Sequence, residues 1–319
     1  MNDKGFVIDL IERIANRKSL RLSLQAHPVP SECPLPEQVT VSAGALSTAW
    51  TIRGERHKPV IMLHGVAPRS GTVYTGQLLE LHPEICASPR GLYEVPFLNL
   101  AERIRRTQQQ FLSTYPQNED KIGRDDFLPL FGASFIAYLN AAVPDGQRAF
   151  LKNPDVCGLD CFPYLFPFEV PFLLLRDGRD VVESTVRTWP ERRFTDTCRL
   201  WNNNARFMLE QQRTHAELGW RIFYYEDASA RPKEFVKQIC QHFQLDASRY
   251  PYDRIDEIGV WGSSVVRKDG QVAWEGLPKP SDFNPIGRWR NWTPSQKEIF
   301  KQICGRTLID SGYVQNNDW

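Results

Sequence analysis

The stretch "PVIMLHGVAPRSGTVYTGQLLEL", residues 59–81, decides the fold class. Its first part, "PVIMLHG", is mostly apolar, which is typical of a strand buried in a parallel sheet. A tight turn between Gly65 and Gly71 follows, and after it comes a segment with the apolar spacing of a helix. Free N–H groups in such a turn, together with the N-terminus of the helix, attract an anion. We therefore expect a strand–loop–helix unit with an anion site.

The same pattern of an apolar run followed by helical spacing recurs along the chain. Apolar runs at residues 148–153, 171–177 and 220–227 are each followed by a segment with helical spacing. Strands that alternate with helices indicate right-handed crossovers and a sheet covered on both faces. We predict an α/β fold with a P-loop-type parallel sheet flanked by helices on both faces. Ligands of such sheets bind at the carboxyl ends of the strands.

The N-terminal part of the chain has a different texture, and we place a boundary after residue 58. In this extension, residues 1–19 have the spacing of an amphipathic helix, the next segment is rich in proline, and residues 38–53 alternate enough to predict a hairpin or edge strands. Residues 59–319 form the predicted catalytic domain. We expect no membrane span, because no apolar run is long enough.

Composition narrows the function classes. The chain has 319 residues and a net charge of +1, so its overall charge gives no reason to expect nucleic acid or an anionic membrane as a partner. Seven scattered cysteines, an odd number, do not indicate a disulfide framework. We expect reduced, mostly buried thiols and a cytoplasmic protein.

The residues that this loop lacks narrow the class of ligand that it can bind. An ATPase loop carries a lysine after its second glycine and a hydroxyl for magnesium. Here Thr72 follows Gly71 directly, and Arg69 supplies a forked cation suited to phosphate oxygens, beside the hydroxyl of Ser70. An ordinary turn with a surface arginine is the alternative.

A second segment, "FPFEVPFLLLRDGRDVVESTVRTWP", residues 166–190, strengthens the anion-binding interpretation. It predicts another buried strand that ends at Arg176, followed by a helix that Asp177 caps. Ser184 lies about two helical turns after Arg176, so a guanidinium and a hydroxyl can bind one more phosphate. The alternative is a local ion pair between Arg176 and Asp180.

With "PRSGT" and "RDGRDVVES" in this order, the chain resembles the PAPS-dependent sulfotransferases, where PAPS is 3′-phosphoadenosine 5′-phosphosulfate. It is nearest to the tyrosylprotein and heparan-type branches. The similarity runs from about Pro59 to the C-terminus and leaves the first 58 residues outside. It implies PAPS as co-substrate and no metal.

The resemblance also implies roles for single residues. The loop from Arg69 to Val73 would hold the 5′-phosphosulfate, although the family usually has a second threonine at position 73. Arg176 and Ser184 would hold the 3′-phosphate. The remaining donor contacts would come from an adenine-side tyrosine, from one of two adjacent serines, and from cations of an irregular stretch near the 3′-phosphate: Tyr225, Ser263, Ser264, Arg267, Lys279 and Arg288. A core tyrosine and solvated cations are the plainer alternatives.

At the reacting centre the resemblance implies a base and cations. Glu94 in "SPRGLYEVPFLNL" would take the proton of the acceptor, and its position just before "VPFL" is nearest to the carbohydrate-type enzymes. Lys152, at the end of a predicted strand, and Arg69 would stabilise the departing phosphate. A helix-start acid and a surface lysine are the structural alternatives. His64 is another candidate base.

The sequence thus predicts a sulfotransferase that moves the sulfuryl group from PAPS to a hydroxyl by in-line displacement. A divergent P-loop nucleotide kinase and a non-catalytic nucleotide-binding protein of the same fold are the alternatives. The acceptor stays open among carbohydrate, peptide tyrosine, lipid and small alcohol, and the sequence does not address the oligomeric state.

Overall fold

The computed structural model describes residues 39–266, 272–279 and 283–319. The predicted amphipathic helix, the proline-rich segment and Arg267 lie outside these residues. The chain divides into two compact units that interleave in sequence. Unit 1 takes the described part of Met1–Val60 together with Pro96–Val143 and Cys157–Glu169, and unit 2 takes Ile61–Val95, Pro144–Val156 and Val170–Trp319. The predicted boundary after residue 58 therefore does not coincide with these units.

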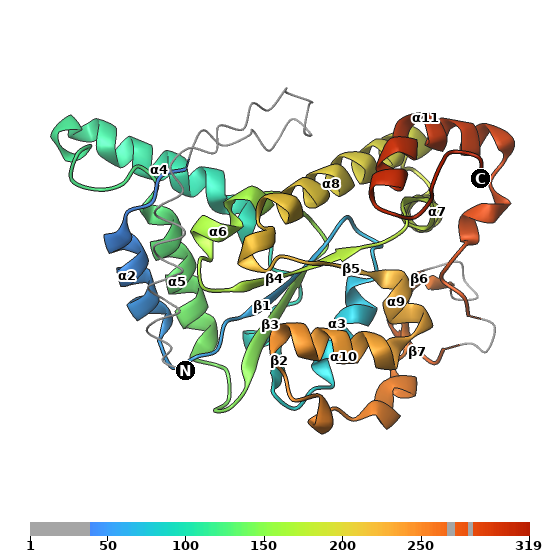
Figure 1. The fold of residues 1–319 in the computed structure, drawn as a ribbon, viewed down its shortest axis with the longest axis horizontal. Coiled ribbons are helices and arrows are strands. Elements are labelled where there is room, and N and C mark those ends of the chain that lie inside the picture. The colour runs from blue at the N-terminus through green and yellow to red at the C-terminus, as the bar shows by residue number, and fades with distance from the viewer. Residues whose placement is uncertain (1–38, 267–271, 280–282) are drawn as a thin grey trace. The chain divides into compact units, whose positions relative to one another are not determined.

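Unit 2 is built on a sheet of five parallel strands in the order β2-β3-β1-β4-β5 (Figure 1). The strands are β1 (Ile61–Gly65), β2 (Ile85–Ala87), β3 (Arg148–Asn153), β4 (Val170–Leu175) and β5 (Ile222–Tyr224). Strand β1 lies at the centre, and β4 pairs with it directly. The chain runs to one side of β1 for β2 and β3, and then to the other side for β4 and β5. The carboxyl ends of β1 and β4 meet at this change of direction, where such sheets bind ligands.

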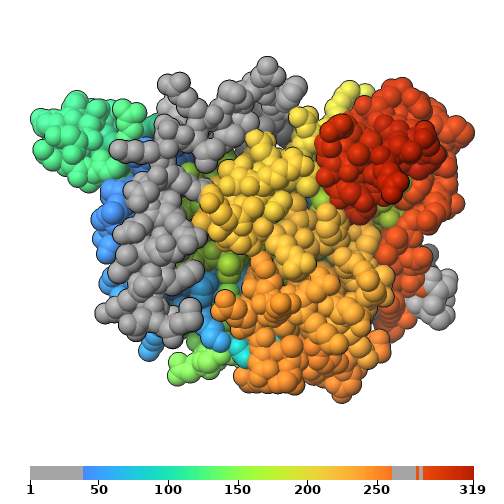
Figure 2. All heavy atoms as spheres, viewed as in Figure 1, coloured from blue at the N-terminus to red at the C-terminus, as the bar shows by residue number. Residues whose placement is uncertain are grey.

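Helices cover the sheet of unit 2, as predicted. On one side, α3 (Thr72–Glu80) and α10 (Pro232–Phe243) pack through a buried apolar cluster to which alternate residues of β1 and β4 contribute. Figure 1 places α8 (Phe194–Thr214) on the other side of the sheet from α10. The last helix, α11 (Pro294–Asp310), lies beside α8, as Figure 2 also shows in red and yellow. Two further helices, α7 (Gly178–Thr188) and α9 (Tyr225–Ala230), begin directly after β4 and β5.

The C-terminal region adds a feature that the sequence did not predict. Strands β6 (Val260–Val266) and β7 (Val272–Leu277) form an antiparallel pair in a stretch that we expected to be irregular. Helix α11 begins with a reciprocal capping box between Thr293 and Gln296.

Unit 1 is helical in its described residues. It contains α2 (Ala43–Arg53), α4 (Ala101–Thr114), α5 (Phe127–Asn140) and the short α6 (Phe162–Leu165). Helix α2 packs along α5. A buried ion pair joins the last residue of α2 to the end of the unit, with Nε of Arg53 2.7 Å from Oε1 of Glu169. Among the helices of the described chain, none has the length and apolarity to span a bilayer.

The hairpin or edge strands predicted for residues 38–53 are wrong, because residues 43–53 form α2. The hydroxyl of Ser42 caps this helix by accepting from the N–H of Ala45 at 3.1 Å. Its buried residues, Ala45, Leu46, Ala49 and Arg53, recur at helical spacing. The serines and threonines that suggested alternation instead lie on the other positions of a helix, where tertiary packing overrides their weak strand preference.

The cysteines differ in part from expectation. Cys161, Cys198, Cys240 and Cys304 are free and buried, and Cys86 is free and half-buried. Cys157 is disulfide-bonded, so the expectation of reduced thiols is wrong at this residue.

Candidate active site

The loop between β1 and α3 has the backbone that an anion site requires. Arg69 and Gly71 both have positive φ, at 74° and 89°, and the loop N–H groups precede the first turn of α3. A Cβ atom at Gly71 would lie 2.1 Å from Cδ2 of Tyr225, so only glycine lets the loop pass over this ring. The geometry explains the glycine at position 71.

Ser70 differs from its expected role. Its side chain is fully buried, and its hydroxyl accepts from the N–H of Ala67 at 3.0 Å and also contacts the carbonyl of Ala67. The hydroxyl therefore closes the loop from inside instead of reaching a ligand. Thr72, in contrast, begins α3 and lines the cavity described next.

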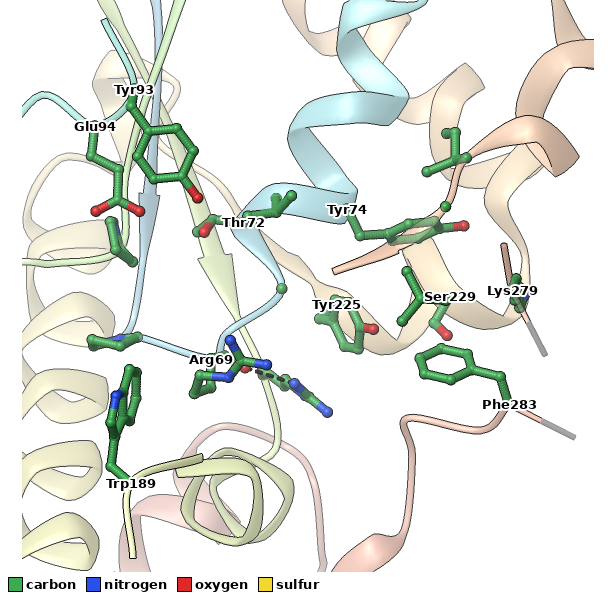
Figure 3. A pocket seen from close by; sticks show the side chains of 18 of the residues that line it. Arg69, Thr72, Tyr74, Tyr93, Glu94, Trp189, Tyr225, Ser229, Lys279 and Phe283 are labelled. Atoms are coloured by element: carbon green, nitrogen blue, oxygen red, sulfur yellow. Dashed lines mark hydrogen bonds between the residues drawn. The ribbon is translucent and has the colours of Figure 1, made fainter. Parts of the chain in front are cut away.

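A cavity of about 390 Å³ opens over this loop, entirely within unit 2 (Figure 3). Figure 3 shows Tyr93, Glu94 and Trp189 at one end of it, Arg69 between, and Ser229, Lys279 and Phe283 at the other end. Eight of the predicted site residues line it: Arg69, Gly71, Thr72, Val73, Glu94, Arg176, Tyr225 and Lys279.

The other predicted residues are not among those that line the cavity. Four of them adjoin lining residues. Ser70 follows Arg69 in the chain, Lys152 lies against the ring of Tyr93, Ser184 accepts a hydrogen bond from Arg69, and Arg288 lies over the ring of Phe283. Ser263 and Ser264 belong to β6, but their side chains, like Arg267, fall outside what the structure describes. The structure also brings in lining residues that the sequence did not single out: Pro68, Tyr74, Tyr93, Pro154, Trp189, Arg192, Ser229, Ile258, Gly259, Val260 and Phe283.

Arg176 joins the two predicted motifs. Its Nη1 donates to the carbonyl of Arg69 at 2.6 Å, and its Nη2 donates to the carbonyl of Pro285 at 2.7 Å. The guanidinium lies 4.4 Å from the ring centre of Tyr225. Its Nε is buried and has no hydrogen-bond partner among the described residues. One donor of a fixed, buried cation therefore remains for a ligand.

The local ion pair between Arg176 and Asp180, which was the alternative, is not formed. Asp180 instead accepts from the N–H groups of Gly287 and Arg288, each at 2.8 Å. This carboxylate thus fixes the segment whose Pro285 carbonyl holds Arg176. Burial raises the pKa of Asp180 despite these hydrogen bonds.

Positive charge accumulates around Arg176. Nε of Arg69 donates to Oγ of Ser184 at 3.2 Å, so the arginine of the first motif reaches the serine of the second. Burial, together with the charges of Arg176 and Arg187, lowers the pKa of Arg69 to about 10. Burial and the same two neighbours also lower the pKa of Arg288. This accumulation of positive charge favours the binding of an anion.

Lys152 ends near the same cavity. Its side chain is mostly buried, and its Nζ has no hydrogen-bond partner among the described residues. The ammonium lies 3.8 Å from the ring centre of Tyr93. Burial lowers the pKa of Lys152, and the carboxylates of Glu94 and Glu80 oppose this shift. Glu94 itself is exposed and points into the cavity (Figure 3).

His64, the other candidate base, is enclosed in the sheet. It is 2% exposed, its Nδ1 lies 3.1 Å from the carbonyl oxygen of Asp155, and it is not among the cavity-lining residues. Burial lowers the pKa of His64 to about 4. The geometry therefore favours Glu94 over His64 as the group that meets an acceptor.

Sequence comparison relates the chain to known proteins. A family model described as "Sulfotransferase family" matches residues 59–249. Protein-tyrosine sulfotransferase A of Caenorhabditis elegans is 24% identical over 277 residues, which cover 82% of this chain and 69% of that protein. Protein-tyrosine sulfotransferase 1 of Homo sapiens is 25% identical over 309 residues, which cover 92% of this chain and 79% of that protein.

Solved structures give more distant likenesses. The sulfotransferase domain of a Synechococcus olefin synthase superposes with a TM-score of 0.48 at 17% identity, covering 80% of this chain and 96% of that one. A mouse sulfotransferase in complex with PAP superposes with a TM-score of 0.42 at 12% identity, covering 89% of this chain and 96% of that one.

The sequence relatives decide between the predicted functions. Neither a nucleotide kinase nor a non-catalytic nucleotide-binding protein is favoured by these matches, since the family model and the curated relatives all carry sulfotransferase names. The matched residues 59–249 make up more than half of the 319 residues. The chain therefore belongs to the sulfotransferase family and is a PAPS-dependent sulfotransferase.

Proposed function

We propose that the cavity of unit 2 binds PAPS and that the protein transfers the sulfuryl group to a hydroxyl acceptor with Glu94 as base. One observation carries the proposal: the arginines of both motifs, Arg69 and Arg176, line a single cavity and are joined by a hydrogen bond. The unpartnered Nε of Arg176 supports the fit, because a buried donor without an acceptor is costly until a ligand supplies one.

The 3′-phosphate would lie against Arg176 and Ser184. The fork of Arg176 is held by two carbonyls and by the ring of Tyr225, so its position is fixed before a ligand arrives. Arg288 and Arg187 add positive charge nearby. A doubly charged phosphate offsets the repulsion among these guanidinium groups.

The 5′-phosphosulfate would lie over the loop. The positive φ angles of Arg69 and Gly71 bring the loop backbone close to a ligand, and the N–H groups of Thr72 and Val73 begin α3, where the helix dipole favours an anion. The adenosine would extend from Tyr225 toward Ser229, Phe283 and Lys279 (Figure 3). Ser263, Ser264 and Arg267 remain proposed contacts of the sulfuryl donor.

PAPS supplies an activated sulfuryl group. The chain's own residues do the rest: Glu94 accepts the proton of the acceptor hydroxyl, while the cations of Lys152 and Arg69 stabilise negative charge as it develops on the phosphate side. Glu94 and Arg69 line the same cavity, with the base toward the end that Tyr93 and Trp189 flank (Figure 3). This arrangement suits in-line attack, because Glu94 lies toward one end of the cavity and Arg69 lies between its two ends (Figure 3).

The acceptor end of the cavity favours a phenol. Two aromatic side chains, Tyr93 and Trp189, flank Glu94 there (Figure 3), and Pro68 and Pro154 also line the cavity. Flat apolar walls hold an aromatic ring better than a hydroxyl-rich sugar. The relatives named protein-tyrosine sulfotransferase point to the same class. We therefore propose a tyrosine-bearing peptide as the acceptor, ahead of carbohydrate, lipid or small alcohol.

The test is transfer of ³⁵S-labelled sulfate from PAPS to a panel of tyrosine peptides, phenols, sugars and alkyl alcohols. The substitution Glu94→Gln should lower kcat by about 10²- to 10⁴-fold, the usual contribution of a general base. Binding of adenosine 3′,5′-bisphosphate should be unchanged, because a neutral amide of similar shape leaves the donor site intact. Glu119→Gln, at an exposed site outside the cavity, is the matched control. Full turnover in Glu94→Gln would remove Glu94 as the base.

A further inference from the structure

The ring of Tyr93 covers the ammonium of Lys152. The distance from Nζ to the ring centre is 3.8 Å, which is well within the range of a cation–π contact. Tyr93 is 58% exposed, yet Nζ beneath it is buried and has no hydrogen-bond partner among the described residues. Among the described residues, an aromatic face and no hydrogen bond thus supports this cation.

The backbone fixes the ring over the lysine. The N–H of Val95 donates to the carbonyl of Lys152 at 3.1 Å, and the N–H of Ser88 donates to the carbonyl of Phe150 at 3.1 Å. The segment that carries Tyr93 is thus tied to β3 on both sides of the tyrosine. Between these two ties the chain turns through positive φ angles, 45° at Ser88 and 62° at Arg90, which is uncommon for residues other than glycine.

The hydroxyl of Tyr93 points into the cavity, toward Thr72 (Figure 3). Ring and hydroxyl are therefore separable: the ring meets Lys152, and the hydroxyl meets the space where a ligand would lie. A lysine side chain has four flexible carbons and a strongly hydrated head, so an unsupported ammonium would turn toward water. A flat ring above the ammonium prevents this movement.

We propose that Tyr93 is a positioning residue for sulfuryl transfer, whose ring holds the ammonium of Lys152 in place and keeps water from it. The inference rests on the proposed role of Lys152 in the reaction. It makes the ring, and not the hydroxyl, the part of Tyr93 that matters for Lys152. Phenylalanine should then replace tyrosine with little loss, whereas alanine should not.

Sulfate transfer from labelled PAPS tests this directly. Tyr93→Phe should keep kcat within about twofold, and Tyr93→Ala should lower it about tenfold, the scale of one desolvated cation–π contact. Tyr115→Ala, which removes a tyrosine that is 61% exposed and lies in unit 1, is the control and should be unchanged. A loss in Tyr93→Phe as large as that in Tyr93→Ala would overturn the proposal, because the hydroxyl would then be responsible.

The alkaline limb of the pH–rate profile is a second readout, which a merely structural role of Tyr93 would not change. Activity falls as Lys152 loses its proton, and burial depresses its pKa against the opposing charges of Glu94 and Glu80. In Tyr93→Ala water reaches the ammonium, which relieves the burial that lowers the pKa of Lys152, so the alkaline limb should move to higher pH relative to Tyr93→Phe. Tyr93→Phe is the reference because it removes the titrating phenol. An unmoved limb in Tyr93→Ala would contradict the proposal.

An NMR measurement separates this inference from the proposed function. In protein labelled with ¹³C-lysine, the ε-CH₂ signal of Lys152 is assigned as the one missing from Lys152→Arg. The ring should displace its proton shift upfield in the wild type and in Tyr93→Phe, and the shift should be ordinary in Tyr93→Ala. If the wild type transferred no sulfate while this pattern held, the proposed function would fail and the contact would stand. An ordinary shift in the wild type would overturn the contact itself.

Discussion

The substitution Arg176→Lys tests whether the second motif reads the 3′-phosphate. Lysine keeps the charge of Arg176 but has a single nitrogen in place of the fork. The wild-type guanidinium spans two carbonyls, those of Arg69 at 2.6 Å and Pro285 at 2.7 Å, and leaves Nε over for a ligand. One ammonium cannot occupy all three positions. The variant therefore isolates geometry from charge.

The magnitude follows from the contact that is lost. A hydrogen bond to a charged group contributes about 1.5–3 kcal/mol, and we take roughly 2 kcal/mol for the bond from Nε to a phosphate oxygen. This corresponds to an affinity about 30-fold weaker for adenosine 3′,5′-bisphosphate. Adenosine 5′-monophosphate lacks the 3′-phosphate, so its affinity should change by less than about threefold. The discrimination between the two ligands should shrink by about tenfold or more.

Isothermal titration calorimetry with both nucleotides measures this discrimination, and urea denaturation of the free protein measures any general loss of stability. Arg199→Lys, at an exposed arginine of α8 that pairs with Asp196, is the matched control. Two results would refute the reasoning. If both nucleotides weakened by the same factor, Arg176 would support the cavity without reading the phosphate, and if neither weakened, the 3′-phosphate would lie elsewhere.

Two further predictions follow from the packing of unit 2. Gly71→Ala should lower the melting temperature and weaken the binding of adenosine 3′,5′-bisphosphate at least tenfold, because its Cβ would overlap the ring of Tyr225 at 2.1 Å in addition to the strain of a φ of 89°. The control is Gly146→Ala, with a φ of 79° and no neighbour within 4 Å, which should show the backbone strain alone. Equal effects of the two substitutions would contradict the overlap. Folding stability should fall as the pH drops from about 6.5 to about 4. The pKa of His64 is about 4 in the folded protein and about 6.5 in the unfolded chain, so the unfolded chain binds more protons in this pH range. At pH 5 this one group costs about 2 kcal/mol, and urea denaturation of wild type and His64→Gln at pH 7 and pH 5 should show a smaller loss in the variant; equal losses would exclude His64 as the source.

Much of the sheet could be predicted because its signals are local. Buried parallel strands appear as apolar runs in a sequence. Strands β1, β3 and β5 fall within the runs identified from sequence, and β4 begins one residue before its run. Residues 43–53 failed for the opposite reason. Their serines and threonines suggest alternation, whereas the decisive contacts, from Ser42 to Asp126 at 2.7 and 2.8 Å, join residues 84 apart in the chain.

The site residues that belong to a sequence motif could be predicted, whereas those that only the folded chain brings together could not. Arg69 and Arg176 stand in recognisable patterns, and the adjacency of β1 and β4 brings them together. Tyr93 had one available signal, its place beside Glu94 in the sequence. Ser229 and Phe283 had none, because nothing in their local sequence shows that they reach this cavity. The inward turn of the Ser70 hydroxyl likewise depends on the closed loop and not on residue type.

The ring of Tyr225 lies against both motifs, since it limits position 71 to glycine and carries the guanidinium of Arg176 on its face. The two proposed phosphate subsites would consequently share one rigid support. A fragment with a single phosphate loses its translational and rotational freedom for one contact, whereas a bisphosphate loses it once for both ends. Inhibitor design on this cavity should therefore expect fragment affinities to combine non-additively, with linked fragments exceeding the sum of their parts.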